Sequence, residues 1–135
     1  MSKMIFISLP VRDLAASTAF YRAIGCTKNE QFSDETTACM NWSETISFML
    51  LNHAIYATFT DKPIADAREV SPMMVALTLD SREAVDEIVA AAGANGGKAD
   101  PREEKEMGFM YQRTFEDPDG NLFEPLWFNP EASVG

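Results

Sequence analysis

The sequence has few cysteines, a single histidine and a deficit of positive charge, and each shortage excludes a class of protein. Its 135 residues include two cysteines and one histidine, and 11 basic against 21 acidic residues give a net charge of -10 at pH 7. Most of such a surface repels nucleic acid and anionic membranes, so we expect neither as a partner. Cys26 and Cys39 form no CxxC pair and are too few for a secreted disulfide framework, which predicts reduced thiols and a cytoplasmic protein.

Long hydrophobic runs are also missing. The stretch MSKMIFISLPVRDL has one lysine and a short apolar run that ends at Pro10, which predicts neither a signal peptide nor a membrane span. The sequence has no Gly-rich phosphate loop and no Ser/His/Asp motif. With 46% hydrophobic and 24% charged residues, the 135-residue chain has the composition and length of one globular domain.

Two segments of the chain repeat one pattern. Residues 6–25, FISLPVRDLAASTAFYRAIG, align without a gap on residues 74–93, MVALTLDSREAVDEIVAAAG. Both read as a strand, a helix-capping residue, a helix and a glycine, and Asp13 falls opposite Ser81. This repeat predicts that the chain is built from two equivalent modules.

Each predicted helix has signals at both ends and one apolar side. Asp13 and Ser81 can accept hydrogen bonds from the first turn, and Gly25 and Gly93 can adopt the left-handed conformation that ends a helix. The apolar positions that gather on one side are Leu14, Phe20, Tyr21 and Ile24 in the first helix, and Val85, Ile88, Val89 and Ala92 in the second. This spacing predicts helices that pack on a sheet.

Strands are predicted after each helix. The apolar and β-branched runs lie near 26–32, 36–42 and 45–51 in the first half, and near 97–100, 108–116 and 121–128 in the second. The DPDG sequence supplies the proline and glycine of a turn before the last strand, and DPREEKEMG is expected to be a loop. We therefore predict one α+β domain with two tandem β-α-β-β-β modules, about 1–52 and 72–128, joined by a linker over about 53–71 with a short helix near 55–59.

Glu124 is an acid within the apolar sequence LFEPLW of the last predicted strand. Strand alternation puts Phe123 and Pro125 on one face and Glu124 with Leu126 on the other, and that second face could simply be wet. If Glu124 is buried instead, it needs an arginine or amide partner, or a raised pKa that would suit proton transfer.

The paired modules and the closing sequence DPDGNLFE resemble the vicinal oxygen chelate superfamily, which contains glyoxalase I, bleomycin-resistance proteins and extradiol dioxygenases. The segments QFSDETTACM, GFMYQRTFEDPDGNLFE and PLWFNP are similar, more narrowly, to bacterial proteins described as predicted lactoylglutathione lyases. The resemblance covers nearly the whole chain. It implies that the two modules curl their sheets into a cleft.

The resemblance also locates candidate site residues. Metal-binding members place one ligand on the first and one on the last strand of each module, and these positions are Phe6, Met49, Met74 and Glu124 here. Three of the four are not normal ligands for Zn, Ni, Mn or Fe(II), so we expect no catalytic metal, with a divalent metal as the alternative. His53 follows the strand of Met49 and is more typical of a loop histidine.

The candidate positions suit a ligand better than a metal. Phe6, Met49 and Met74 are either core residues or a soft apolar lining for a hydrophobic or aromatic molecule. Tyr111 and Arg113 would share one side of a strand, where they either bind an anionic ligand or Glu124 or form an external ladder.

Two classes of function therefore remain. The first is a metal-free protein that binds a small hydrophobic or aromatic molecule, as bleomycin-resistance proteins do. The second is a metal-dependent enzyme, either a lactoylglutathione lyase-type lyase with Glu124 as proton shuttle or an extradiol-type dioxygenase. In both, we expect a homodimer, with each cleft closed by two modules of one chain or by modules exchanged between subunits.

Overall fold

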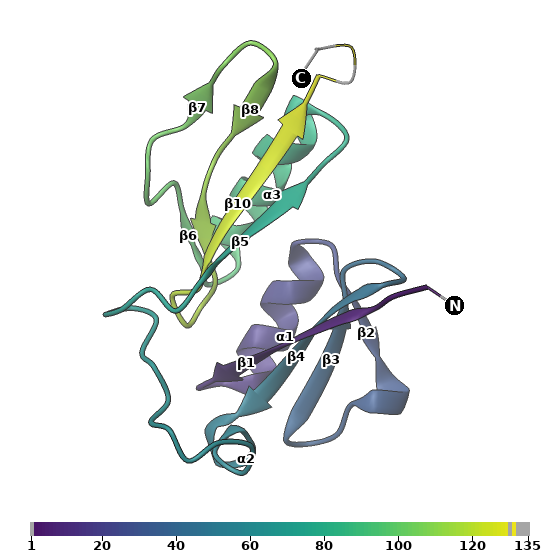
Figure 1. Cartoon of the computed structure of the whole chain (residues 1–135), viewed down its shortest axis with the longest axis vertical. Helices are drawn as coiled ribbons and strands as arrows, with labels where there is room; N and C mark the ends of the chain where they lie inside the picture. Colours follow the sequence, from purple (N-terminus) through teal and green to yellow (C-terminus); the bar gives the residue numbers. More distant parts are fainter. Residues whose placement is uncertain (1, 130, 132–135) are drawn as a thin grey trace. The chain divides into compact units, whose positions relative to one another are not determined.

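The fold is known from a computed structural model, which describes residues 2–129 and 131 (Figure 1). The chain divides between Asp66 and Ala67 into two compact units, each with one long helix and one sheet. This confirms the predicted mixed α+β fold. Among the described residues, every helix is too short or too polar to cross a lipid bilayer.

The first unit is a four-stranded sheet with a helix on one face. Its elements are β1 (Ile5–Val11), α1 (Leu14–Ala23), β2 (Thr27–Asn29), the short 3-10 helix η1 (Glu30–Phe32), β3 (Thr37–Asn41), β4 (Ile46–Asn52) and the one-turn helix α2 (His53–Tyr56). The strand order is β1-β4-β3-β2, with β1 parallel to β4 and the other neighbours antiparallel.

The second unit repeats this plan with shorter strands. Its elements are β5 (Met74–Thr78), α3 (Arg82–Ala94), β6 (Lys98–Ala99), β7 (Lys105–Glu106), β8 (Met110–Gln112), β9 (Phe115–Glu116) and β10 (Leu122–Phe128). The last strand, β10, is central: it pairs parallel with β5 and antiparallel with β8 and β9. β6 continues the sheet beyond β9, and β7 continues it beyond β8.

The register of the strands confirms the internal repeat. Phe6 pairs with Ser47, two residues before Met49, and Met74 pairs with Leu122, two residues before Glu124. Phe6 and Met49 of the first unit therefore correspond to Met74 and Glu124 of the second, as the family resemblance implies.

The predicted helix starts are confirmed, but one predicted helix end is wrong. Asp13 Oδ1 accepts from Ala16 N at 3.0 Å and Ser81 Oγ accepts from Ala84 N at 3.0 Å. Gly25 has a φ of +116°, as expected after α1. Gly93 lies inside α3 and does not end it. A Cβ at this position would come within 3.1 Å of the Ala99 Cβ, so the glycine lets the helix approach β6.

Two predicted strands are shorter in the structure. The expected strand 26–32 stops at Asn29, whose side chain accepts from Gln31 N and starts η1. The expected strand 108–116 is divided into β8 and β9. Pro125 lies opposite Arg113 and has no N–H to return the hydrogen bond that its carbonyl accepts, so the ladder is interrupted there.

The linker helix starts earlier than predicted, and the predicted loop after β6 contains a short strand. The short helix predicted near 55–59 begins earlier, at His53, because the Asn52 side chain caps it by accepting from Ile55 N at 2.9 Å. The segment predicted as the loop DPREEKEMG contains β7, which pairs with β8. A two-residue strand is too short to show a period in sequence.

Each core lies between the sheet and its long helix. In the first unit Phe20, Tyr21 and Phe48 are fully buried, with the Tyr21 and Phe48 ring centroids 5.4 Å apart. In the second unit Phe115 and Phe123 are fully buried and stacked, with centroids 5.0 Å apart and planes at 4°. The predicted apolar positions of α3 are all buried, which confirms the side of that helix that faces the sheet.

Candidate functional site

Glu124 lies on the sheet face opposite to α3, which we call the open face of the second unit. Its strand neighbours Phe123 and Pro125 are buried toward α3, so alternation along β10 turns Glu124 the other way. Glu124 is half-buried. The structure therefore supports neither a fully wet strand position nor a fully buried acid.

One amide holds the Glu124 carboxylate. Gln112 Nε2 donates to Glu124 Oε2 at 2.9 Å, across the β8 and β10 strands. This is the only hydrogen bond of the Glu124 side chain in the described residues, so Oε1 accepts none there. Gln112 is absent from our sequence prediction. Its place between Tyr111 and Arg113 puts it on the opposite side from them, and its pairing with Leu126 puts that side on the face of Glu124.

A cavity of about 900 Å³ lies over this part of the open face. Its floor is made by Glu124, Gln112, Met74 and Leu122, and its wall by residues 101–105, which join β6 to β7. The volume is within the range of sites for small organic molecules. Of the predicted site residues, the structure thus brings Met74 and Glu124 together in one cavity.

Tyr111 and Arg113 lie on the helix side of the same sheet. The Tyr111 hydroxyl donates to Asp86 Oδ1 at 2.6 Å and Arg113 Nη1 donates to the same oxygen at 2.8 Å, and Asp86 belongs to α3. This confirms that the two residues share one side of their strand. It also shows that they contact Asp86, where a contact with Glu124 was one of the alternatives.

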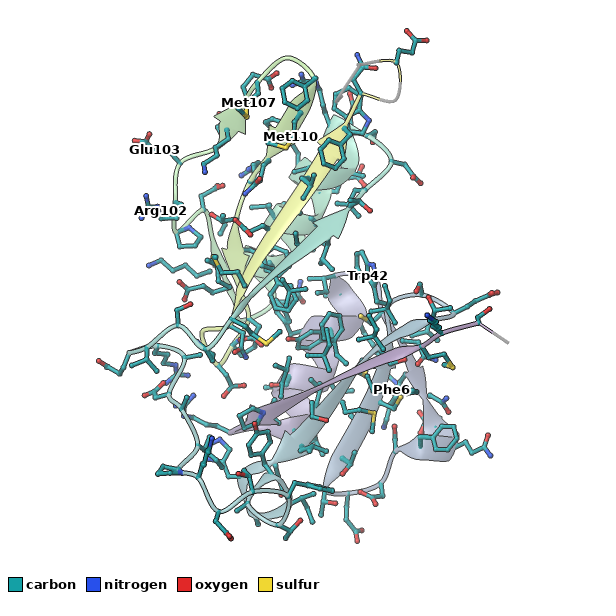
Figure 2. All side chains as sticks on the ribbon, in the orientation of Figure 1. Phe6, Trp42, Arg102, Glu103, Met107 and Met110 are labelled. Carbon is teal, nitrogen blue, oxygen red and sulfur yellow. The ribbon has the colours of Figure 1, made fainter. Side chains whose placement is uncertain are left out.

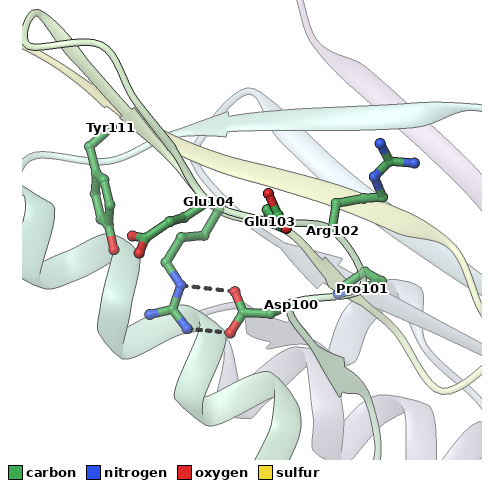
Figure 3. A pocket seen from close by; sticks show the side chains of 7 residues that line it. Asp100, Pro101, Arg102, Glu103, Glu104 and Tyr111 are labelled. Carbon is green, nitrogen blue, oxygen red and sulfur yellow. Dashed lines mark hydrogen bonds and ion pairs between the residues drawn. The ribbon is translucent and has the colours of Figure 1, made fainter.

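Arg113 is further held by Asp100. Its Nε and Nη2 donate to the two carboxylate oxygens of Asp100 at 3.0 and 2.6 Å (Figure 3). Asp100 has a left-handed φ of +52°. A smaller cavity of about 500 Å³ lies here, lined by Tyr111, Arg113 and residues 100–104. The guanidinium group of Arg113 thus donates to two carboxylates, Asp86 and Asp100. A role of Tyr111 and Arg113 in ligand binding stays a prediction.

The Asp86 network gives a testable dependence on pH. The hydrogen bond from Tyr111, followed by that from Arg113, holds the pKa of Asp86 below its usual value. A lowered pKa in the folded state adds stability above the unfolded-state pKa of about 4 and loses it as the pH falls through the folded-state pKa. Urea unfolding at neutral pH and at about pH 3 should therefore show a larger acid-induced loss of stability in wild type than in Asp86→Asn. Equal losses would contradict the network.

Phe6 and Met49 occupy the equivalent face of the first unit. Phe48 and Leu50 are buried toward α1, so Met49 between them faces away from the helix. Met49 pairs with Ser8 of β1, so Ser8 and Phe6 face the same way as Met49. Phe6 is 53% exposed and Met49 is half-buried, so Phe6 is not a core residue. A role of these two residues in ligand binding stays a prediction.

The cysteines offer no reactive thiolate. Cys26 and Cys39 are both free and buried. Burial raises the pKa of Cys26 to about 12 and also raises the pKa of Cys39. A thiol with a raised pKa stays protonated at neutral pH and is a poor nucleophile.

The metal that the resemblance implies does not fit the donors present. Phe6, Met49 and Met74 offer a phenyl ring and two thioethers, and Glu124 alone offers a carboxylate. Within residues 2–129 and 131, no three histidine, cysteine, aspartate or glutamate side chains come together to form a metal site. The side chains at these four positions therefore do not fit a catalytic Zn, Ni, Mn or Fe(II) ion.

Comparisons with solved structures agree with this fold. A hypothetical protein from S. aureus has a TM-score of 0.78 at 23% identity over 94% of each chain. The fosfomycin resistance protein FosX from Listeria monocytogenes has a TM-score of 0.67 at 22% identity, over 99% of this chain and 97% of that one. The bleomycin resistance determinant encoded on the transposon Tn5 has a TM-score of 0.64 at 19% identity, over 94% and 98%. At these identities the similarity shows a shared fold alone.

Comparison with protein families is more specific. No curated protein matches this sequence. The sequence profile of one family, however, matches residues 3–124, which is nearly the whole chain and includes both copies of the internal repeat. The chain therefore belongs to the glyoxalase/bleomycin resistance protein/dioxygenase superfamily.

Proposed function

We propose that this protein binds a small organic molecule with an apolar or aromatic body on the open face of its second unit, without a catalytic metal. One observation carries the proposal: Glu124 Oε1, which accepts no hydrogen bond in the described residues, lies beside Met74 and Leu122 in a cavity of about 900 Å³. Small-molecule sites combine apolar walls with a few placed polar groups in this way.

The chemistry of the cavity favours a ligand that carries a hydrogen-bond donor. A carboxylate only accepts hydrogen bonds, and Gln112 already occupies one of its oxygens. The thioether of Met74 is polarizable and adapts to flat aromatic surfaces. Benzyl alcohol, which combines an aromatic ring with one hydroxyl donor, is therefore a suitable minimal probe.

The proposal is tested by binding measurements on wild type and on Glu124→Gln, which keeps the shape but removes the charge. We expect benzyl alcohol to bind wild type and to bind Glu124→Gln about three- to tenfold more weakly, since a hydrogen bond to a charged group is the stronger kind. Glu87→Gln, on the exposed side of α3, is the matched control and should behave as wild type.

A metal titration separates this proposal from the metal-dependent lyase or dioxygenase. Zn, Ni, Mn and Fe(II) should not raise the melting temperature of wild type more than that of Glu124→Gln, because one carboxylate binds these ions weakly. About one tightly bound ion per chain, lost in Glu124→Gln, would instead favour the enzyme.

The homodimer and the cytoplasmic location are parts of this proposal. Met4, Ile5 and Phe6 are more than half exposed at the start of β1, which is an edge strand of its sheet. An exposed apolar edge of this kind is typically covered by another chain. Sedimentation equilibrium would test the dimer, and the free thiols of both cysteines are consistent with a reducing compartment.

A further inference from the structure

Three polar side chains form a row across the open face of the second unit. Lys105 of β7 pairs directly with Gln112 of β8, so their side chains lie on the same face of the sheet. Gln112 in turn donates to Glu124 of β10. All three residues line the cavity of about 900 Å³. The row thus runs from a cation through an amide to a carboxylate.

Within the described residues, neither charge at the ends of the row forms an ion pair, unlike the charges on the helix side. Lys105 makes no ion pair within the described part of the chain, and Glu124 makes only its bond to Gln112. On the helix side, Arg113 binds two aspartates and Arg82 forms an ion pair with Glu106. The helix-side charges are thus paired with one another, whereas Lys105 and Glu124 can each accept a charged group from outside the protein.

The remaining charged residues of the cavity wall are Arg102, Glu103 and Glu104. Figure 2 shows the side chains of Arg102 and Glu103 extending outward from the segment between β6 and β7. Glu104 also lines the smaller cavity and lies beside Tyr111 there (Figure 3). Burial, the hydrogen bond to Asp86 and then Glu104 raise the pKa of Tyr111. Lys105 and Glu124 are the charged residues that lie next to Gln112 on the open face.

We propose that this pocket selects a zwitterionic ligand, with an ammonium group at Glu124, an anionic group at Lys105 and an apolar body over Met74 and Leu122. This inference rests on the proposed function, because it names the class of molecule that the same cavity takes. β7 and β10 flank β8, and Glu124 lies two residues along β10 from Leu126, the register partner of Gln112. Two strand spacings and this offset together separate the two charged residues by roughly 12 Å at the backbone. The flexible lysine shortens that span, and Gln112 can hydrogen bond to the ligand between its charges.

Four small aromatic probes separate the contributions of the two charges. They are 4-(aminomethyl)benzoate with both charges, benzylamine with the cation, benzoate with the anion, and benzyl alcohol with neither. Calorimetric titration of wild type should show that 4-(aminomethyl)benzoate binds about tenfold or more tightly than each of the other three, with the advantage reduced by added salt.

Variants at each end of the row assign the preference to single residues. Glu124→Gln should remove the advantage of 4-(aminomethyl)benzoate over benzoate, and Lys105→Met should remove its advantage over benzylamine. Lys105→Glu should reverse the preference, so that benzylamine binds better than 4-(aminomethyl)benzoate. Lys98→Met, on β6 and outside this cavity, is the control and should leave all four affinities unchanged.

The possible failures are distinct. If 4-(aminomethyl)benzoate and benzyl alcohol bind wild type equally well, the charge row has no role and the inference is overturned, while the proposed function stands. If the Lys98→Met control changes the preference as much as Lys105→Met, the inference is also overturned, because the effect is then one of net charge. If none of the four probes binds, both the inference and the proposed function are overturned.

Discussion

Phe123→Ala is expected to lower the free energy of unfolding by about 3–5 kcal/mol, the usual cost of removing a fully buried aromatic ring. The ring is fully buried against α3 and stacks on Phe115 with centroids 5.0 Å apart, so its removal leaves a cavity and loses the ring contact. Urea denaturation followed by circular dichroism measures the change.

The next residue of the same strand provides the contrast. Glu124→Ala, one position further along β10, should change the free energy of unfolding by less than about 1 kcal/mol, because its side chain lies half-buried on the open face. It should instead weaken the binding of benzyl alcohol. If the two substitutions had similar effects on stability, the assignment of the two faces of β10 would be wrong.

Gly120→Ala is the second substitution with a large expected effect. Gly120 ends the turn before β10 with a φ of +95°, and an added Cβ would lie 2.8 Å from Arg68 N and 2.9 Å from Ala67 C. Both atoms belong to the backbone and cannot rotate away. We expect a loss of about 2–4 kcal/mol in urea denaturation, from the left-handed conformation and the clash together.

Gly108 provides the matched control for this prediction. It also has a positive φ, +76°, but an added Cβ would meet nothing within 4 Å. Gly108→Ala should therefore cost about 1 kcal/mol, the conformational term alone. An equal cost at the two glycines would contradict the close approach of residues 67–68 to the turn.

The features that the sequence predicts well are those specified by neighbouring residues. Asp13 and Ser81 cap their helices through bonds to residues three positions along the chain, and the repeat of residues 6–25 in 74–93 predicts the strand and helix that open each unit. The prediction that Gly93 ends its helix is wrong, because this glycine instead allows a close contact between α3 and Ala99 of β6. Local pattern cannot distinguish a glycine that ends a helix from one that lets a strand approach it.

The candidate site is predictable only in part for the same reason. The family resemblance locates Glu124 and Met74. Strand alternation separates Gln112 from Tyr111 and Arg113, but the pairing of β8 with β10 decides which of them share the face of Glu124. No sequence pattern marks Lys105 as a site residue, because β7 is only two residues long and its pairing with Gln112 depends on the folded sheet. The hydrogen-bond partners of Arg113 are not predictable from local sequence either, since Asp86 lies 27 residues away in the chain.

The measurement that tests the central claim most directly is a titration of the protein, labelled with ¹³C at its eight methionine methyl groups, with benzyl alcohol. Met74 is 60% exposed and lines the proposed site, whereas Met40 is fully buried and Met73 lies outside that cavity. The Met74 signal, assigned with Met74→Leu, should shift and saturate in wild type and shift less in Glu124→Gln, while Met40 stays unchanged. A saturable response of other methionines with Met74 unmoved would contradict a ligand site at Glu124.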